Sequence, residues 1–259
     1  MLDTMNTEPN ATEGILSIDP IDMNELPTGT LREMLAAGDV VANCHRVLSN
    51  TGDNIVGELI KDAGTFYEWQ HYPDGDVYDR RTHAQYYYHA HPKEERTGEH
   101  GHFHTFLRPK GMPKNVHPSR AVPDYRSPRE DNEALSHLIA VSMDRQGFPI
   151  RLFTTNRWVT GEFWYRASDV VRMLERFEID HAQPSWPVNM WIGAMLTMFR
   201  PQIRALILQR DVAIAQWQRL KKPDNVYEDR SLEVTSEVPV DVEKQLEAIR
   251  AALAGRPEE

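Results

Sequence analysis

Five histidines lie close together in the segment 86–108, whose sequence is YYYHAHPKEERTGEHGHFHTFLR. They are arranged as HxH, an eight-residue polar insert and HxHxH, and they are His89, His91, His100, His102 and His104. Alternate side chains of a β-strand share a face and lie about 6.6–6.8 Å apart, so imidazoles separated by one residue can reach one ion. Imidazole nitrogens bind zinc, iron, copper and nickel. The spacing predicts a divalent transition-metal site, with zinc or iron expected first and copper or nickel as alternatives.

The residues around the histidines predict a β-hairpin. Aromatic and β-branched side chains flank both groups, which is typical of strands. The insert 92–99 begins with proline and contains Gly98, as expected of a loop between antiparallel strands. The hairpin would therefore carry a histidine-rich face.

Hairpin geometry narrows the expected ligands. With a symmetrical loop, His89 faces His102; with a register slipped by two residues, His91 faces His102. These three histidines are central in either register. His100 and His104 would lie about 13 Å apart on a regular strand, too far for one ion unless the strand bends.

Two glutamates of the insert complete the expected chemistry. Glu95 and Glu99 lie in or beside the loop and can supply an oxygen ligand or a catalytic base. Without a metal, the histidines would instead bind an anionic ligand, sense pH, or hydrogen-bond to one another.

A long basic loop, 108–129, follows the second histidine strand without a break and contains five prolines. Long loops inside a domain are usually functional or mobile. If the loop lies over the site, Arg108 and Arg120 would bind an anionic substrate; otherwise it is a solvated connector. Further on, the turn NRWVTGEFW offers Arg157, Trp158 and Glu162, which either line a substrate pocket or cap a sheet edge.

Bulk composition excludes several classes of protein. The chain has 259 residues, of which 40% are hydrophobic and 26% charged, as in ordinary globular proteins. Its net charge of −10 argues against non-specific nucleic-acid binding. Cys44 is the only cysteine, so no intrachain disulfide can form. No secretory signal or membrane-length apolar run is visible, and we expect a cytoplasmic protein.

The periodicity predicts an α+β fold. Residues 65–165 are expected to form an antiparallel sheet of about five or six strands, packed by helices from both ends of the chain. Residues 65–72 are the first expected strand, followed by a turn at 73–76. We expect a flexible arm at 1–27, a single domain at 28–220 with the hairpin 86–108, and a linker plus docking helix at 221–259. That helix would dock on the body or on a second subunit.

Two resemblances follow from these motifs. His89, His91 and Glu95 resemble the cupin arrangement of HxH followed by glutamate, which implies a metal site completed by a later histidine. The next histidines follow within nine residues, however, and the second cupin motif is absent. The HGHFH run together with TTNRWVTGE resembles an uncharacterised conserved bacterial family over most of residues 30–220, and this resemblance implies no activity.

The function that these patterns favour is a metal-dependent enzyme, of hydrolase or oxygenase type, that acts on a small substrate. The basic loop would suit a substrate that is anionic. One alternative is a non-catalytic metal-binding protein for sensing, storage or delivery. Another is a module that binds a small molecule or a partner through its histidines.

Overall fold

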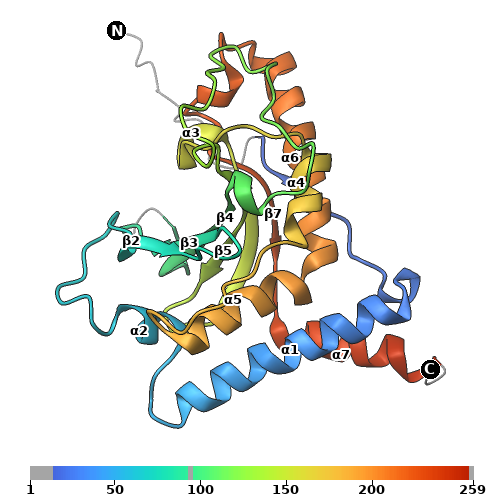
Figure 1. Cartoon of the computed structure of the whole chain (residues 1–259). Helices are drawn as coiled ribbons and strands as arrows, with labels where there is room; N and C mark the ends of the chain where they lie inside the picture. The colour runs from blue at the N-terminus through green and yellow to red at the C-terminus, as the bar shows by residue number, and fades with distance from the viewer. Residues whose placement is uncertain (1–13, 93–95, 257–259) are drawn as a thin grey trace, which may run out of the picture.

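A single mixed sheet forms the centre of the computed structural model, which describes residues 14–92 and 96–256 (Figure 1). In this described part the sheet has seven strands in the order β1-β7-β6-β5-β4-β3-β2. Neighbouring strands are antiparallel, except that β1 and β7 are parallel. The strands are β1 (Leu16–Ser17), β2 (Tyr72–Tyr78), β3 (Ala84–His89), β4 (Gly101–Leu107), β5 (Ser136–Met143), β6 (Pro149–Thr155) and β7 (Val234–Pro239).

The helices come from both sides of strands β2–β6 in the sequence, and they pack on the sheet or on one another. In Figure 1, α1 and α7 lie side by side, and α5 lies between α1 and the sheet. The helices are α1 (Thr28–Ser49), α2 (Ile55–Ile60), α3 (Arg157–Thr160), α4 (Ala167–Leu174), α5 (Trp186–Met198), α6 (Arg200–Lys221) and α7 (Val242–Ala254). None of those in the described part is long and apolar enough to cross a membrane.

Strand alternation divides the hairpin into an apolar face and a histidine face. Tyr86, Tyr88 and Phe103 are fully buried in the main core, which they share with Leu31 of α1 and Trp191 of α5. Because successive side chains of a strand point to opposite faces, the histidines of β3 and β4 lie on the face away from these helices.

The expected mixture of helices with a mostly antiparallel sheet is confirmed, but the sheet is larger than expected. The additional strands, β1 and β7, come from outside residues 65–165. Strand β7 belongs to a polar stretch that composition alone assigns to a linker. Its pairing with β6 buries hydroxyls that bond one another: Thr154 Oγ1 lies 2.7 Å from Thr235 Oγ1 and 2.6 Å from Ser236 Oγ.

The first expected strand is displaced along the chain. Residues 65–71 are not a strand, and the expected turn at 73–76 lies inside β2. The pairing of β2 with β3 shifts register between Tyr72 and Val77. Gly75 and Asp76 have φ angles of 79° and 61°, so the turn signal of this sequence produces an irregularity within a strand instead of a connection.

The ends of the described chain are attached to the body. Part of the expected flexible arm forms β1, and Met23 is buried. The guanidinium of Arg256 donates hydrogen bonds to the main-chain carbonyls of Met23, Asn24 and Leu26. Residues 1–13 lie outside the described residues, and the proposed division into domains stays a prediction.

The C-terminal helix α7 docks on its own chain. It packs against α1, and Gln245 Nε2 donates to the carbonyl oxygen of Met198 at 3.1 Å. A role for α7 in forming a homo-oligomer stays a prediction.

Candidate metal centre

The hairpin closes in the symmetrical register. His89 of β3 is paired with His102 of β4, and Tyr87 with His104. Register and alternation together place His89, His102 and His104 on one face of adjacent strands. His91 follows directly after β3 and reaches the same place.

Three histidine rings converge at this position. His89, His91 and His102 each offer a ring nitrogen within 4.8 Å of the other two. The Nε2 atoms of His89 and His102 are 2.7 Å apart. With zinc–nitrogen bonds of about 2.0–2.1 Å, the nitrogens of a tetrahedral site lie about 3.3 Å apart. Side-chain movements of roughly 1 Å would therefore fit the three rings to one ion, and the geometry is compatible with metal binding.

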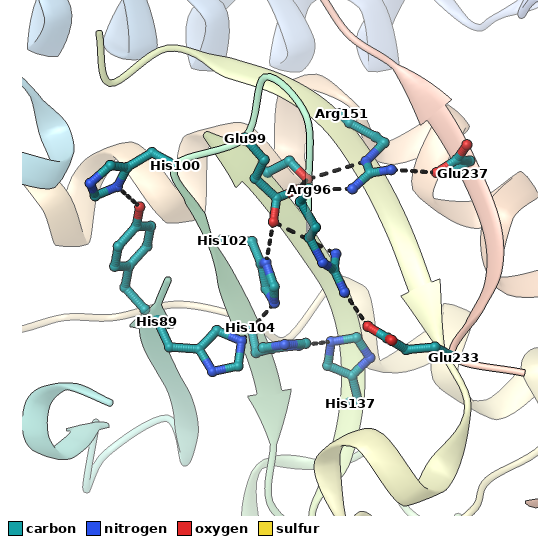
Figure 2. Close-up of polar contacts among 12 residues, drawn as sticks. His89, Arg96, Glu99, His100, His102, His104, His137, Arg151, Glu233 and Glu237 are labelled. Atoms are coloured by element: carbon teal, nitrogen blue, oxygen red, sulfur yellow. Dashed lines mark hydrogen bonds and ion pairs between the residues drawn. The ribbon is translucent and has the colours of Figure 1, made fainter. Parts of the chain in front are cut away.

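Glu99 fixes the orientation of His102. Its Oε1 lies 2.7 Å from His102 Nδ1 (Figure 2). A carboxylate only accepts, so this nitrogen carries the proton and donates a hydrogen bond to the carboxylate. The lone pair of His102 then lies on Nε2, which points towards His89. A carboxylate that holds the distal nitrogen of an imidazole is the usual support of a metal-binding histidine.

The Glu99 carboxylate is itself held from several elements. Its Oε2 accepts hydrogen bonds from Ser142 Oγ of β5 at 2.5 Å and from Arg151 Nη2 of β6 at 2.9 Å. Arg151 also forms a 2.7 Å ion pair with Glu237 of β7. Arg96 lies 3.6 Å from Glu99 Oε1. The side chain of Glu99 is only 3% exposed, so this network compensates a buried charge.

Burial keeps the imidazoles neutral. Loss of hydration, together with the neighbouring His91, lowers the pKa of His89 to about 3. Burial likewise holds the pKa values of His102 and His104 well below their ordinary value. Neutral imidazole is the form that coordinates metals, so the His89 and His102 rings are in the required state at neutral pH.

The row of buried histidines continues from β4 onto β5. His104 Nδ1 lies 3.0 Å from His137 Nε2, and the His104 ring centroid is 4.7 Å from that of His102 (Figure 2). The Nε2 of His104 is buried and has no hydrogen-bond partner within the described part of the chain. His104 is thus adjacent to the convergent nitrogens but is not one of them.

Sequence reasoning missed His137, Arg96 and Arg151. His137 is a single histidine in the apolar run ALSHLIAVSM, and only the pairing of β5 with β4 brings it to the site. The available signal was the position of His137 in a predicted strand. Which residues it would contact depends on how that strand pairs with β4, and the sequence does not reveal this register.

His100 lies away from the three convergent rings. Its Nδ1 is 2.6 Å from the hydroxyl of Tyr88, a residue of the main core, and its ring lies near Phe66. Glu95 lies outside the described residues, so the ligand set implied by the cupin resemblance stays a prediction.

The basic loop starts at the far end of β4. Arg108 follows His102 by six residues, which is about 20 Å along a strand. Its Nε donates to Gln85 Oε1 at 2.7 Å and its Nη1 to the carbonyl of Asn132 at 3.1 Å. Arg120 lies over the ring of Tyr125. The structure does not bring Arg108 or Arg120 to the histidines, and their role in binding an anion stays a prediction.

Arg157 and Trp158 of the 156–164 turn have their ion-pair and hydrogen-bond partners outside the histidine hairpin. Arg157 forms ion pairs with Asp124 at 2.5 Å and with Glu228 at 2.6 Å. Trp158 Nε1 donates to the carbonyl of Leu232 at 2.9 Å. Arg157 lines a cavity of about 220 Å³ to which Glu162 also contributes.

Glu162 is buried beside β5. Its Oε2 accepts a hydrogen bond from the main-chain N–H of His137 at 2.6 Å, and burial raises its pKa to about 7. Through His137 this carboxyl lies next to the histidine row but does not reach it. Substrate binding by Arg157, Trp158 and Glu162 stays a prediction.

Comparison with known proteins gives a family but no function. Neither the curated proteins nor the solved structures contain a significant match to this chain. A family profile with the description "Domain of unknown function (DUF6969)" matches residues 35–240. The match covers the histidine hairpin and every strand from β2 to β7. The expectation of an uncharacterised family is confirmed, and the chain belongs to the DUF6969 family.

Proposed function

We propose that this protein is a metal-dependent enzyme whose divalent transition ion, zinc or iron, is bound by His89, His91 and His102. The observation that carries the proposal is the convergence of three ring nitrogens within 4.8 Å, with the His102 ring oriented by a buried carboxylate. A catalytic zinc usually has three protein ligands, and its remaining position binds water or substrate.

The surrounding residues have positioning roles in this proposal. When bound, the ion would supply Lewis acidity and activate water or dioxygen for a reaction of hydrolase or oxygenase type. Both oxygens of Glu99 are occupied, by His102 on one side and by Ser142 and Arg151 on the other. We therefore assign Glu99 to holding His102 in place, in contrast to the catalytic base expected from its place in the sequence. The substrate is a small molecule, and its anionic character remains part of the proposal.

A second candidate is a non-catalytic metal-binding protein. The buried Nε2 of His104, which has no hydrogen-bond partner among the described residues, supports it, because the ring centroid of His104 lies 5.3 Å from that of His89. If this nitrogen is a fourth ligand, the coordination is complete, as in structural sites, and no position remains for a substrate.

Elemental analysis of the full chain after loading with zinc or Fe(II) tests the proposal. We expect about one ion per chain, lost in His89→Ala and in His102→Ala. His100→Ala is the matched control from the same hairpin, and His117→Ala is an exposed control; both should keep the ion. Wild-type protein that remains metal-free, or equal loss in the His100→Ala control, would contradict the assignment.

The visible spectrum of cobalt-loaded protein separates the two candidates. An open position predicts a spectral change on adding azide and full metal content in His104→Ala. A closed set of four histidines predicts no response to azide and loss of metal in that variant.

A further inference from the structure

An exposed tryptophan lies beside the three convergent histidines. Trp69 belongs to the segment between α2 and β2, and 54% of its surface is exposed. Its ring centroid lies 4.2 Å from that of His91 and 6.5 Å from that of His89, with interplanar angles of 67° and 87°. A zinc ion bound to His91 would lie about 3 Å from the centroid of that imidazole. The indole centroid would therefore lie at most about 7 Å from the proposed ion.

The backbone at this position is unfavourable for a large side chain. Trp69 has a φ of 66°, in the left-handed region that glycine adopts most readily. Its N–H donates to the carbonyl of Ala90 at 2.9 Å, and Ala90 separates His89 from His91. The loop is thus held against the histidines. Strained backbone that surrounding contacts maintain is concentrated at functional sites.

Packing alone does not account for this side chain. A tryptophan that served only the core would be buried, whereas more than half of this one is exposed. The ring of the nearby Tyr87 is covered, in contrast to that of Trp69, because His71 stacks on its face with the ring centroids 3.6 Å apart and an interplanar angle of 9°. Tyr67, two residues before Trp69 in the sequence, is 60% exposed.

We propose that Trp69 is the stacking platform for a flat ring of the substrate, whose metal-binding group lies at the ion held by His89, His91 and His102. This inference rests on the proposed metal site and adds the substrate class: a small molecule that joins a planar ring to a metal-binding oxygen or nitrogen group. Aromatic rings stack in offset or edge-to-face geometry, and an aliphatic group gains no such contact.

Two hydroxamates test the proposal with zinc-loaded, full-length protein. Acetohydroxamate and benzohydroxamate carry the same metal-binding group, and only the second carries a ring. We expect wild-type protein to bind benzohydroxamate about three- to tenfold more tightly, the range that aromatic pairs provide. In Trp69→Leu this preference should fall below about twofold, while acetohydroxamate affinity and zinc content stay unchanged. Trp69→Phe should keep most of the preference.

Two further variants complete the design. Trp69→Gly suits the left-handed backbone angle, so it removes the ring even if Trp69→Leu folds poorly. Trp186→Leu is the matched control: this tryptophan is 62% exposed but lies on α5, on the opposite side of the sheet. It should leave the preference unchanged.

The possible failures are distinguishable. If the protein takes up no zinc, or the zinc-loaded protein binds neither hydroxamate, the metal proposal fails and the platform with it. If both bind but the wild-type preference persists in Trp69→Leu and Trp69→Gly, the platform is wrong and the metal site stands.

Discussion

Replacing Glu99 by glutamine is the sharpest test of how the site is held. Glu99 accepts hydrogen bonds at both oxygens, from His102 Nδ1 on one and from Ser142 and Arg151 on the other. Glutamine has one acceptor oxygen and one donor NH₂ group. It therefore cannot serve His102 and Arg151 at the same time.

Either orientation of the new amide weakens the site. With its NH₂ towards His102, the imidazole must accept at Nδ1 and carry its proton on Nε2, where the metal would bind. With its NH₂ towards Arg151, two donors face each other and the amide is displaced. Loss of such an outer carboxylate weakens metal affinity about 10–100-fold, which corresponds to about 1.4–2.7 kcal/mol.

The assay is competition for zinc between the protein and a chromophoric chelator. Glu237→Gln is the matched control, because Glu237 accepts from Arg151 at 2.7 Å on the outer side of the same network. We expect this control to stay within about threefold of wild-type affinity. The reasoning is refuted if folded Glu99→Gln binds zinc as tightly as wild type, or if both variants lose affinity equally.

Two further predictions concern stability. Burial raises the pKa of Glu162 to about 7 from an ordinary value of 4.5, so its stabilising effect is complete below pH 4.5 and is lost as pH rises through 7. Between pH 4.5 and 8.5, denaturant unfolding should show wild type losing about 3 kcal/mol more than Glu162→Gln, which keeps an acceptor for the His137 N–H; parallel curves would contradict this. A chain that starts at Leu26 loses β1 and the buried Met23, whose side chain alone contributes about 1.5–3 kcal/mol to stability. It should therefore melt at least about 3 °C lower than a chain that starts at Gly14. Equal melting temperatures would show that this segment is dispensable.

The period-two spacing of histidines was sufficient to predict which three rings converge in the candidate site. It depends only on local strand geometry and on one hairpin, both of which a short stretch of sequence specifies. This is why His89, His91 and His102 were identified as central in either register. The same spacing also predicts His100 as a metal ligand. His100 lies just before β4 and instead forms a hydrogen bond with Tyr88.

The supporting residues could not be found in this way, because they depend on strand order. Arg151 reaches Glu99 across 52 residues, and His137 reaches His104 across 33. The contact between Arg151 and Glu99 requires β5 to pair with β4 and β6 with β5, and the contact between His137 and His104 requires the first of these pairings. Both pairings have registers that are irregular near their ends. Local patterns do not encode such pairings.

The polar face of the hairpin also bears on which function is favoured. Every residue of β4 is buried, including His102 and His104. One face of this central strand therefore buries imidazoles, whereas apolar side chains at the same positions would carry no desolvation cost. The Nε2 of His104 has no hydrogen-bond partner in residues 14–92 and 96–256, and a buried polar atom left so adds a penalty of about 1–3 kcal/mol. Stability alone would not select this arrangement, and burial keeps the pKa of His89 near 3, far below the neutral range. Neutral, converging and oriented imidazoles are what a transition-metal ion requires, and this requirement accounts for all three properties together.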